Sequence, residues 1–520
     1  MTKTKLIFAT ALALLTACAN DDTTRNEQQG ADNIPAGATL FSGETNPADG
    51  TTRTAIVNHT KGGGAKVNWS TGDQIWVKDN GGTWRQSGAA SFPVATNKSY
   101  AKFALNGTYN NPTHQVVYTN LPIASIAQVE IKSEQTQSTT NNFDHAGVSG
   151  DCGIATASGG DSKYSFTLEH KAAYLCIYPR IENNLLHKNV KIEQIVITST
   201  SGPIAGKYDF STGSLGAMPI SSASNSITLT TTSGEISLDT RIDTCYYVVI
   251  APGNHTLKVE YYINDPDSHV SAVISKDLGT ISCAAGKMAD ITAWIDKDIT
   301  YYPNAGHNYY MWDAQQNFWA GYEWDSANPQ QPILRNGFSS YAPSSPTDPR
   351  YANMTPASLS YGTRYDATTP LFKTLPNANE MLWYIQRGNP LYDAGKLWSA
   401  MGHLYKGGTW MKKKAKISGF SDSVTPDGTD LRTTPGTGNT TASTGTPTAA
   451  NIADYFFLPN FGYYLSGGSF YLIGVYGHYW SSSSSPQGNG TGYNLRLEGT
   501  SIDLQYEKEL KNGFFVMPFE

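Results

Sequence analysis

The sequence predicts a mainly β protein with two β-sandwiches and a last domain that mixes strands with a few helices. Between residues 38 and 294, short runs alternate apolar and polar residues and end at Gly, Asn, Asp or Pro. After Trp294 this alternation fades, and seven of the eleven Trp residues lie between Trp312 and Trp480. Only 15% of the 520 residues are charged and 12% are aromatic, which excludes a coiled coil and a mainly disordered chain.

The N-terminus has the pattern of an export signal. Lys3 and Lys5 precede an apolar run over residues 6–15, which is too short to span a bilayer. The run ends in Leu15-Thr16-Ala17-Cys18, and small residues before a Cys resemble a bacterial lipobox, in which the thiol is acylated. We expect a signal peptide over 1–18, a membrane anchor through lipid on Cys18 and a flexible tether over 19–35. An ordinary signal peptide with an incidental Cys is the alternative.

Four further cysteines allow two interpretations. They are Cys152, Cys176, Cys245 and Cys283. None has the CxxC spacing of a zinc site. Export permits disulfides, but Cys176 and Cys245 lie inside apolar strand-like runs, which favours buried thiols.

The alternating region is long enough for two sandwiches, over residues 36–158 and 159–298. The small residues Ser158-Gly159-Gly160 predict a seam before a strand at 164–168. Other expected strands lie at residues 65–69, 74–78, 114–118, 191–197 and 256–262.

Motifs in this region resemble the fimbrillin-type lipoproteins of Bacteroidetes. Thr52-Arg53-Thr54 followed by Trp69-Ser70-Thr71-Gly72-Asp73-Gln74-Ile75-Trp76-Val77 is similar to their N-terminal domain. Residues 166–175 and 246–253 are similar to their second domain. The resemblance covers about half of the chain. It implies two transthyretin-like Greek-key sandwiches, a lipid-anchored location at the outer membrane and cell surface, and assembly with other fimbrial subunits by strand donation.

Strand donation has a simple physical basis. A sandwich that loses an edge strand exposes unpaired backbone and an apolar groove, and a strand from a neighbour restores both. Residues 38–41 are a candidate first strand, followed by a loop over 42–52. The resemblance implies proteolytic processing after an Arg here, and Arg53 is the candidate. Alternatively, Arg53 is a solvated turn residue and the strand stays in place, as in anchoring subunits.

The last domain, over 299–520, is expected to contain two helices and one long loop. Asn377-Ala378-Asn379-Glu380 predicts a capping box and a helix that stops at Gly388. A second helix is expected from about Asp393 to Gly407-Gly408. Residues 421–450 are rich in Ser, Thr, Gly and Pro and predict a disordered surface loop, too poor in apolar residues to pack.

The distal strands of this domain carry a second resemblance. Phe456-Phe457-Leu458-Pro459, the run 477–482 and the terminal 513–518 are similar to the major paralogous domain described in Fibrobacter. Residues 375–381 together with 513–516 resemble the C-type-lectin-like fold. The resemblance implies an α+β C-type-lectin-like domain, but it does not identify the ligand of that domain. The absence of Cys after Cys283 excludes the thiol chemistry of formylglycine-generating enzymes, and the calcium motifs of sugar-binding C-type lectins are missing.

Catalytic and metal-binding motifs are absent from the sequence. The sequence contains no HExxH, GxSxG or Walker motif, so we expect no enzyme activity, cofactor or metal. The single histidines of the last domain are expected to be packing or hydrogen-bonding residues; they are His307, His403 and His478. The acids of the long loop are expected to be solvated; they are Asp422, Asp427 and Asp430. The net charge is −6 and the chain has no strongly basic region, which argues against nucleic acid as a partner. A hydrolase would need a carboxylate pair that sequence cannot place.

Aromatic residues give the main hint of ligand binding, because sugars stack on exposed rings and protein interfaces favour Trp and Tyr. The candidates are Trp312, Trp319, Trp324, Tyr463, Tyr464 and Tyr471. The alternative is that these side chains form the core. The sequence thus predicts a non-enzymatic minor or tip subunit of a fimbrium, whose last domain binds a host or bacterial glycan or protein. The alternative is a stand-alone glycan-binding surface lipoprotein that does not polymerise.

Overall fold

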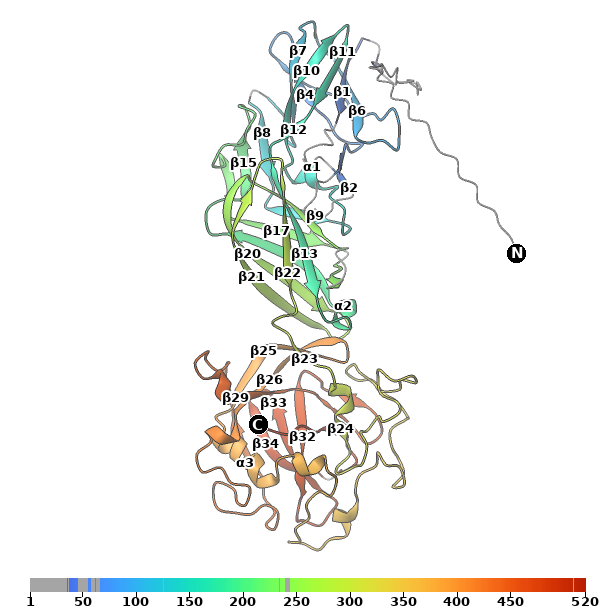
Figure 1. The fold of residues 1–520 in the computed structure, drawn as a ribbon, viewed down its shortest axis with the longest axis vertical. Helices are drawn as coiled ribbons and strands as arrows, with labels where there is room; N and C mark the ends of the chain where they lie inside the picture. Colours follow the sequence, from blue (N-terminus) through green and yellow to red (C-terminus); the bar gives the residue numbers. More distant parts are fainter. Residues whose placement is uncertain are drawn as a thin grey trace, which may run out of the picture.

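A computed structural model describes residues 35, 37–44, 55–57, 61, 66–124, 126–232, 234–238, 244–507 and 509–520. The chain is mainly β, and two strand-rich bodies and the C-terminal domain follow one another along the long axis (Figure 1). No helix in the described part of the chain has the length and apolar content needed to cross a lipid bilayer. The expected signal peptide, Cys18 and Arg53 lie outside the described residues.

The first body is built on an eight-stranded sheet with the order β5-β4-β7-β10-β11-β1-β6, and β12 pairs with β10. Its strands are β1 (Thr39–Glu44), β4 (Trp76–Lys78), β5 (Trp84–Gln86), β6 (Tyr100–Leu105), β7 (Thr113–Tyr118), β10 (Gly153–Gly160), β11 (Lys163–Thr167) and β12 (Glu169–His170). A separate pair joins β2 (Ala55–Val57) to β3 (Lys66–Asn68). Side chains at alternate strand positions, such as Phe41, Phe103 and Tyr164, form one buried apolar cluster.

The boundary between the two bodies differs from the predicted seam at 158–160. β11 lies beyond that seam, yet it pairs with β1 and β10 in the first sheet. Conversely, β8 (Gln128–Ile131) and β9 (Glu134–Gln137) pair with strands of the second body. Gly159 belongs to a close strand pairing, because a Cβ there would lie 2.1 Å from the Lys163 carbonyl oxygen. The small residues at the predicted seam therefore serve this pairing and mark no linker.

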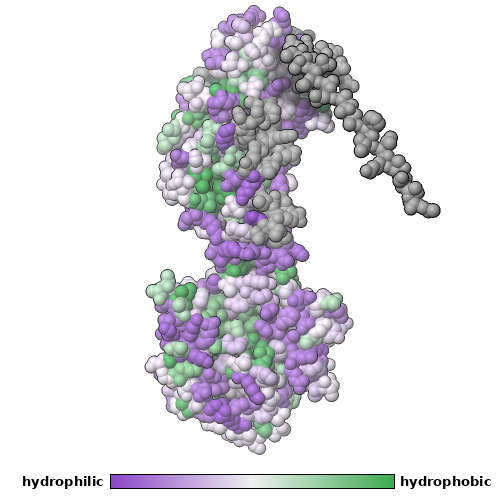
Figure 2. Space-filling model, viewed as in Figure 1, coloured by the Kyte–Doolittle hydropathy of each residue, from purple (hydrophilic) through white to green (hydrophobic). Residues whose placement is uncertain are grey.

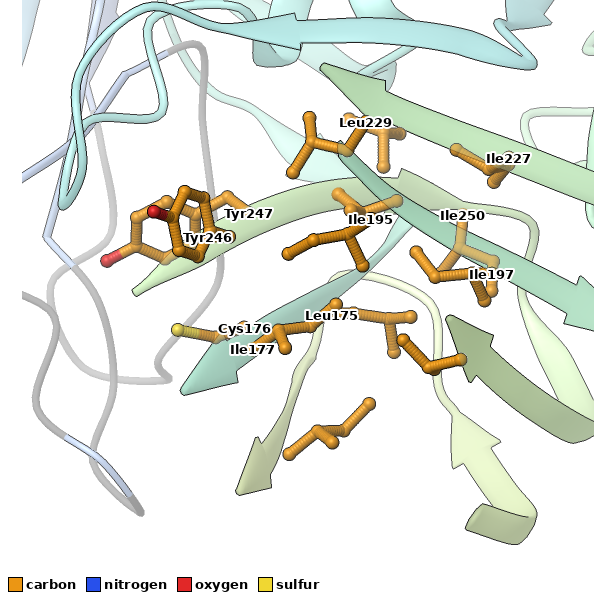
Figure 3. Packing of buried hydrophobic residues seen from close by; sticks show 14 of the residues in the cluster. Leu175, Cys176, Ile177, Ile195, Ile197, Ile227, Leu229, Tyr246, Tyr247 and Ile250 are labelled. Atoms are coloured by element: carbon orange, nitrogen blue, oxygen red, sulfur yellow. The ribbon is translucent and has the colours of Figure 1, made fainter. Parts of the chain in front are cut away.

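The second body packs two sheets against each other. One has the order β21-β20-β14-β17-β9, and the other places β13 between β19 and β22. Besides β8 and β9, this body contains α1 (Ala146–Ser149), β13 (Ala173–Ile181), α2 (Leu186–Asn189), β14 (Lys191–Ser199), β15 (Ala205–Asp209), β16 (Ser221–Ser224), β17 (Ser226–Thr231), β18 (Ser237–Leu238), β19 (Tyr246–Ile250), β20 (Gly253–Asp265), β21 (Val270–Cys283) and β22 (Met288–Trp294). Figure 3 shows how Leu175 and Ile177 of β13 pack against Ile195 and Ile197 of β14.

All four described cysteines are buried free thiols, which confirms the interpretation that the apolar runs favoured. Burial raises the pKa of Cys283 to about 12 and the pKa of Cys152 well above its usual value. Because the thiolate is the reactive form, both groups are chemically quiet at neutral pH.

The C-terminal domain contains a sheet of order β23-β25-β26-β29 and a second sheet of order β24-β35-β32-β33-β34-β27. Its strands are β23 (Thr300–Tyr302), β24 (Tyr309–Tyr310), β25 (Leu391–Ala400), β26 (His403–Lys412), β27 (Gly438–Thr441), β28 (Ser443–Thr444), β29 (Tyr455–Pro459), β30 (Tyr463–Tyr464), β31 (Phe470–Tyr471), β32 (Tyr476–Ser484), β33 (Gly492–Glu498), β34 (Ser501–Glu507) and β35 (Phe514–Phe515). Short 3-10 turns lie at Ala305–His307, Thr355–Ser358, Phe372–Thr374, Lys414–Lys416 and Ile452–Asp454.

The first predicted helix of this domain is confirmed and the second is wrong. α3 (Ala378–Arg387) begins at Asn377 with a complete capping box to Glu380. Residues 391–412 instead form the hairpin β25–β26. Its two-residue turn, Met401-Gly402, has φ of 50° and 82°, the left-handed geometry that fits a tight hairpin. The apolar spacing of Leu397, Met401 and Leu404 imitates a helix, but the turn lies at its centre.

The prediction that residues 421–450 form a disordered loop, too poor in apolar residues to pack, is also wrong. Leu431 and Ala442 are buried in the domain core, and the loop contains β27 and β28. The buried Asn379 of α3 donates to the Ser423 carbonyl oxygen and to Asp430 Oδ1, both at 2.9 Å, and accepts from Leu431 N at 2.8 Å. Polar bonds to one helix residue therefore replace the apolar contacts that the composition lacks.

Candidate functional site

The first strand lies inside its sheet and is not at an edge. β1 pairs antiparallel with β6, where Phe41 faces Phe103, and parallel with β11, where Phe41 faces Tyr164. The strand predicted at residues 38–41 is present, but the prediction that it is an easily exchanged edge strand is wrong. Removing β1 would leave two open ladders and a gap one strand wide, so an incoming strand must satisfy both neighbours.

Side chains of β1 define what such a gap accepts. Phe41 is fully buried and stacks on Tyr164, with ring centroids 4.9 Å apart, and meets Tyr109 edge-on at 5.1 Å. Two residues later, a Cβ on Gly43 would lie 2.7 Å from Cζ of Phe166. A strand in this position therefore needs a large apolar residue followed, two positions on, by a very small one.

Three of the predicted ligand-binding aromatics belong to the core. Trp312, Trp319 and Tyr464 are fully buried. Trp312 Nε1 donates to the Ser481 carbonyl oxygen at 3.0 Å, and the rings of Trp319 and Tyr464 pack edge to face at 5.3 Å. Burial raises the pKa of Tyr464 well above its usual value. These residues cannot present a ring to a sugar, and the alternative that aromatics build the core holds for them.

The other three aromatics keep some exposure. Trp324, Tyr463 and Tyr471 are half-buried. The structure brings Tyr463 and Tyr471 together on the short pair β30–β31, with ring centroids 6.0 Å apart and 24° between the rings. Trp324 instead covers Gly306, where a Cβ would lie 2.4 Å from the indole ring.

A cavity of about 600 Å³ offers a better candidate for ligand binding in the same domain. It is lined by Pro329, Gln330, Gln331, Pro332, Ile333, Leu334, Gly337, Phe338, Ser339, Ser340 and Tyr341. Phe338 is 68% exposed and Tyr341 is 45% exposed, which is unusual for large aromatic side chains in a well-packed domain. None of these eleven residues carries a charge, so the lining suits an uncharged ligand.

Backbone pairing holds this loop in place. Asn336 N donates to the Phe470 carbonyl oxygen at 2.9 Å, and Phe470 N donates to that of Gly337 at 2.8 Å. Tyr341 packs on Tyr322, with ring centroids 5.0 Å apart, and its carbonyl oxygen accepts from Arg350 at 3.0 Å. The exposed rings are therefore presented by a fixed backbone, which lowers the entropic cost of binding. The available sequence signal was an aromatic residue between Asn336-Gly337 and Ser339-Ser340.

The three histidines singled out in this domain are all engaged. His307 contacts Asp325, and burial lowers the pKa of His478 to about 4 beside Asn494. His403 forms, with Asp265 and Asp267, a group whose ligating atoms lie within 4.8 Å of one another. Both Asp265 oxygens already accept hydrogen bonds from His403 and the backbone of its own turn and of Leu404. Asp265 of the second body and His403 of the C-terminal domain therefore serve as a contact between these two parts of the chain.

Comparisons with known proteins give only distant likenesses. No protein-family model matches the sequence. No curated protein matches it. Among solved structures, "a putative cell adhesion protein" of Bacteroides uniformis is 15% identical, with a TM-score of 0.33 over 50% of this chain and 95% of that one. A fimbrial protein of Bacteroides ovatus is 10% identical, with a TM-score of 0.27 over 92% and 98%. The fimbrial anchor protein Mfa2 of Porphyromonas gingivalis is 10% identical, with a TM-score of 0.21 over 46% and 83%. These scores are too low to carry an argument about this chain.

Proposed function

We propose that this chain is a fimbrial-type cell-surface lipoprotein, a minor or tip subunit of a fimbrium assembled by strand donation. The observation that carries the proposal is the internal place of β1. A strand close to the N-terminus fills a gap between β6 and β11, and its Phe41 fills the centre of the first core. Cleavage after Arg53 would free this strand. A strand from a neighbouring subunit would then restore both ladders and the aromatic contact.

The remaining parts of the chain fit a coupling and binding role. Lipid on Cys18 would hold the newly exported chain at the outer membrane. The C-terminal domain would present the pocket around Phe338 and Tyr341 to a glycan or protein ligand. No enzyme activity is part of this proposal.

A labelled peptide with the sequence of residues 38–44 tests strand replacement. The full chain is treated briefly with a trypsin-like protease and binding is followed by fluorescence anisotropy. We expect the cleaved chain to bind the peptide, and the Arg53→Ala chain neither to be cut near this position nor to bind. A peptide with Phe41→Ala should bind roughly a hundredfold more weakly, because it loses a buried aromatic side chain. A Gly43→Val peptide should not bind, because of the contact with Phe166.

Equal binding of the peptide to cleaved and uncleaved chains, or equal binding of the Phe41→Ala peptide, would contradict strand replacement.

The second candidate function is a stand-alone surface binding protein. The observation in its favour is the pocket beside the exposed rings of Phe338 and Tyr341, which can bind a ligand without any exchange of β1. The N-terminus of protein recovered from cells distinguishes the two: Thr54 indicates a processed subunit, and acylated Cys18 on every molecule indicates the stand-alone protein.

Alanine substitutions at the exposed rings test the pocket of the C-terminal domain. The full chain is screened on glycan and protein arrays, and hits are measured with Phe338→Ala and Tyr341→Ala. Each should weaken binding about fivefold, because a ring contact contributes roughly 1 kcal/mol. Tyr361→Ala is the control, since this ring is 76% exposed and does not line the pocket. Hits that respond equally to all three variants would place the ligand elsewhere.

A further inference from the structure

A second pocket lies at the junction between the second body and the C-terminal domain. This cavity of about 540 Å³ is lined by Glu182, Asn183, Asn184, Leu186, Asp296, Lys297, Ile299, Tyr301 and Ser399. Three separate segments supply these residues: the stretch before and within α2, the connection after β22 together with β23, and β25. Figure 2 shows that the molecule narrows at this level and that its visible surface there is mostly hydrophilic. Junctions between domains are favoured places for small-molecule sites.

Three polar atoms of the lining residues have no hydrogen-bond partner although they are buried. They are Asn183 Nδ2, Asp296 Oδ1 and Ser399 Oγ. Ser399 is only 1% exposed. Burying a polar atom without a partner costs about 1–3 kcal/mol, so three such atoms around one cavity call for a physical explanation.

In Asp296 and Asn183, the second polar atom of the side chain accepts hydrogen bonds from the backbone, and these bonds fix the orientation of the unpartnered atom. Asp296 Oδ2 accepts from the backbone N–H groups of Glu182 at 2.7 Å and Asn183 at 3.1 Å. Asn183 Oδ1 accepts from the N–H groups of Leu185 at 3.0 Å and Leu186 at 3.2 Å. The structure therefore holds one amide donor and one carboxylate acceptor in reserve on adjacent segments.

An aromatic ring stands beside the third free atom. Tyr301 of β23 is paired in register with Ser399 of β25, and registered partners of neighbouring strands lie on the same face. Tyr301 is 41% exposed. One face of the pocket thus combines a flat ring with a free hydroxyl.

We infer that this junction pocket binds a neutral, hydroxyl-rich ligand of the size of a monosaccharide unit. A sugar hydroxyl can donate to Asp296 Oδ1 while it accepts from Asn183 Nδ2, and a second can bond to Ser399 Oγ. The apolar face of a sugar ring can stack on Tyr301. The ion pair between Lys297 and Glu182, whose side chains are 54% and 58% exposed, lines the same cavity and can separate for ligand entry at little cost.

The charges of the lining argue against other small ligands. Glu182 and Asp296 outnumber Lys297, so an anion meets a net negative site. A divalent cation requires several oxygen ligands, whereas Glu182 is paired with Lys297 and Asp296 already uses Oδ2 for two N–H groups. The inference is independent of strand replacement in the first body.

The test uses the full chain and a panel of free monosaccharides: glucose, galactose, mannose, fucose and N-acetylglucosamine. Binding is detected by saturation-transfer NMR and measured by calorimetry. Asn183→Asp keeps the acceptor for Leu185 and Leu186 but replaces the free donor, and Ser399→Ala removes the free hydroxyl. Each should weaken binding of the best sugar about tenfold, the value of one hydrogen bond. Phe338→Ala, in the other pocket, should leave this binding unchanged.

Thr409→Val is the matched control for Ser399→Ala. Thr409 Oγ1 is also buried without a partner, but Thr409 does not line the pocket. Neither variant should lower the melting temperature much, because each removes an unsatisfied hydroxyl. The inference fails if no sugar of the panel shows saturation transfer, if Thr409→Val weakens binding as much as Ser399→Ala, or if Asn183→Asp strengthens binding of calcium chloride while sugars have no effect.

Discussion

A single buried amide explains why a polar segment of about thirty residues packs on the C-terminal domain. Asn379 bonds to Ser423, Asp430 and Leu431, and Arg432 in turn holds Asp430. Partial burial opposes ionisation of Asp430, but the hydrogen bonds from Arg432 and Asn379 outweigh it and lower its pKa to about 2. The carboxylate therefore stays charged, and the clamp remains intact, throughout the physiological pH range.

We predict that Asn379→Ala destabilises the domain by about 3 kcal/mol, since it leaves the buried N–H of Leu431 and one oxygen of Asp430 less satisfied. Hydrogen exchange should accelerate in residues 421–434, and the melting temperature should fall. Asn439→Ala, which changes an exposed Asn of β27, is the control and should alter neither measurement. Unchanged exchange in residues 421–434 would show that the loop packs without this clamp.

At the scale of elements, local signals predicted helices and strands well where one pattern was present. The capping box at Asn377 and Glu380 identified α3 because capping depends only on neighbours in the chain. The hairpin β25–β26 was mistaken for a helix because Leu397, Met401 and Leu404 follow helical spacing. The deciding contacts, pairing with β23 and β29, come from residues far away in the sequence.

Sites were harder to predict than elements, for the same physical reason. Richness in Trp and Tyr does not tell which rings are buried, and Trp312, Trp319 and Tyr464 proved to be core residues. The exposed rings Phe338 and Tyr341 lie in a loop without periodicity, fixed by pairing with Phe470. The internal place of β1 also depends on distant partners, so sequence predicted the strand and missed its position.

At the scale of the whole molecule, a buried contact between hairpin tips helps to join the second body to the C-terminal domain. Asp265, at the end of β20, accepts from His403 Nδ1 at 3.1 Å and from Leu404 N at 2.9 Å. Ser268 Oγ donates to the Leu404 carbonyl oxygen at 2.7 Å, and the fully buried Leu404 packs into the core of the second body. These bonds hold the tip of the β20–β21 hairpin against the tip of the β25–β26 hairpin.

The titration of Asp265 sets the pH range in which this junction holds. Burial opposes its ionisation, yet hydrogen bonds from His403 and Leu404 lower the pKa of Asp265 below its usual value. A group with a lowered folded-state pKa stabilises the fold fully above its unfolded value, near pH 4, and loses that contribution as pH falls through the folded value. The exposed Asp267 is the other carboxylate of this group, and its negative charge repels that of Asp265.

We therefore predict that Asp265→Asn weakens the junction at neutral pH by about 2 kcal/mol, since it removes the charge that strengthens the bonds from His403 and Leu404. Hydrogen exchange should rise at both hairpin tips, residues 265–270 and 401–404, and small-angle scattering should show a broader distribution of lengths. The wild-type chain should reach the same state only below about pH 4. Asp267→Asn is the matched control, because it removes a neighbouring exposed carboxylate and should tighten the junction or leave it unchanged. A junction that loosens equally in both variants would mean that net charge, and not the buried contact, holds the C-terminal domain in line with the rest of the chain.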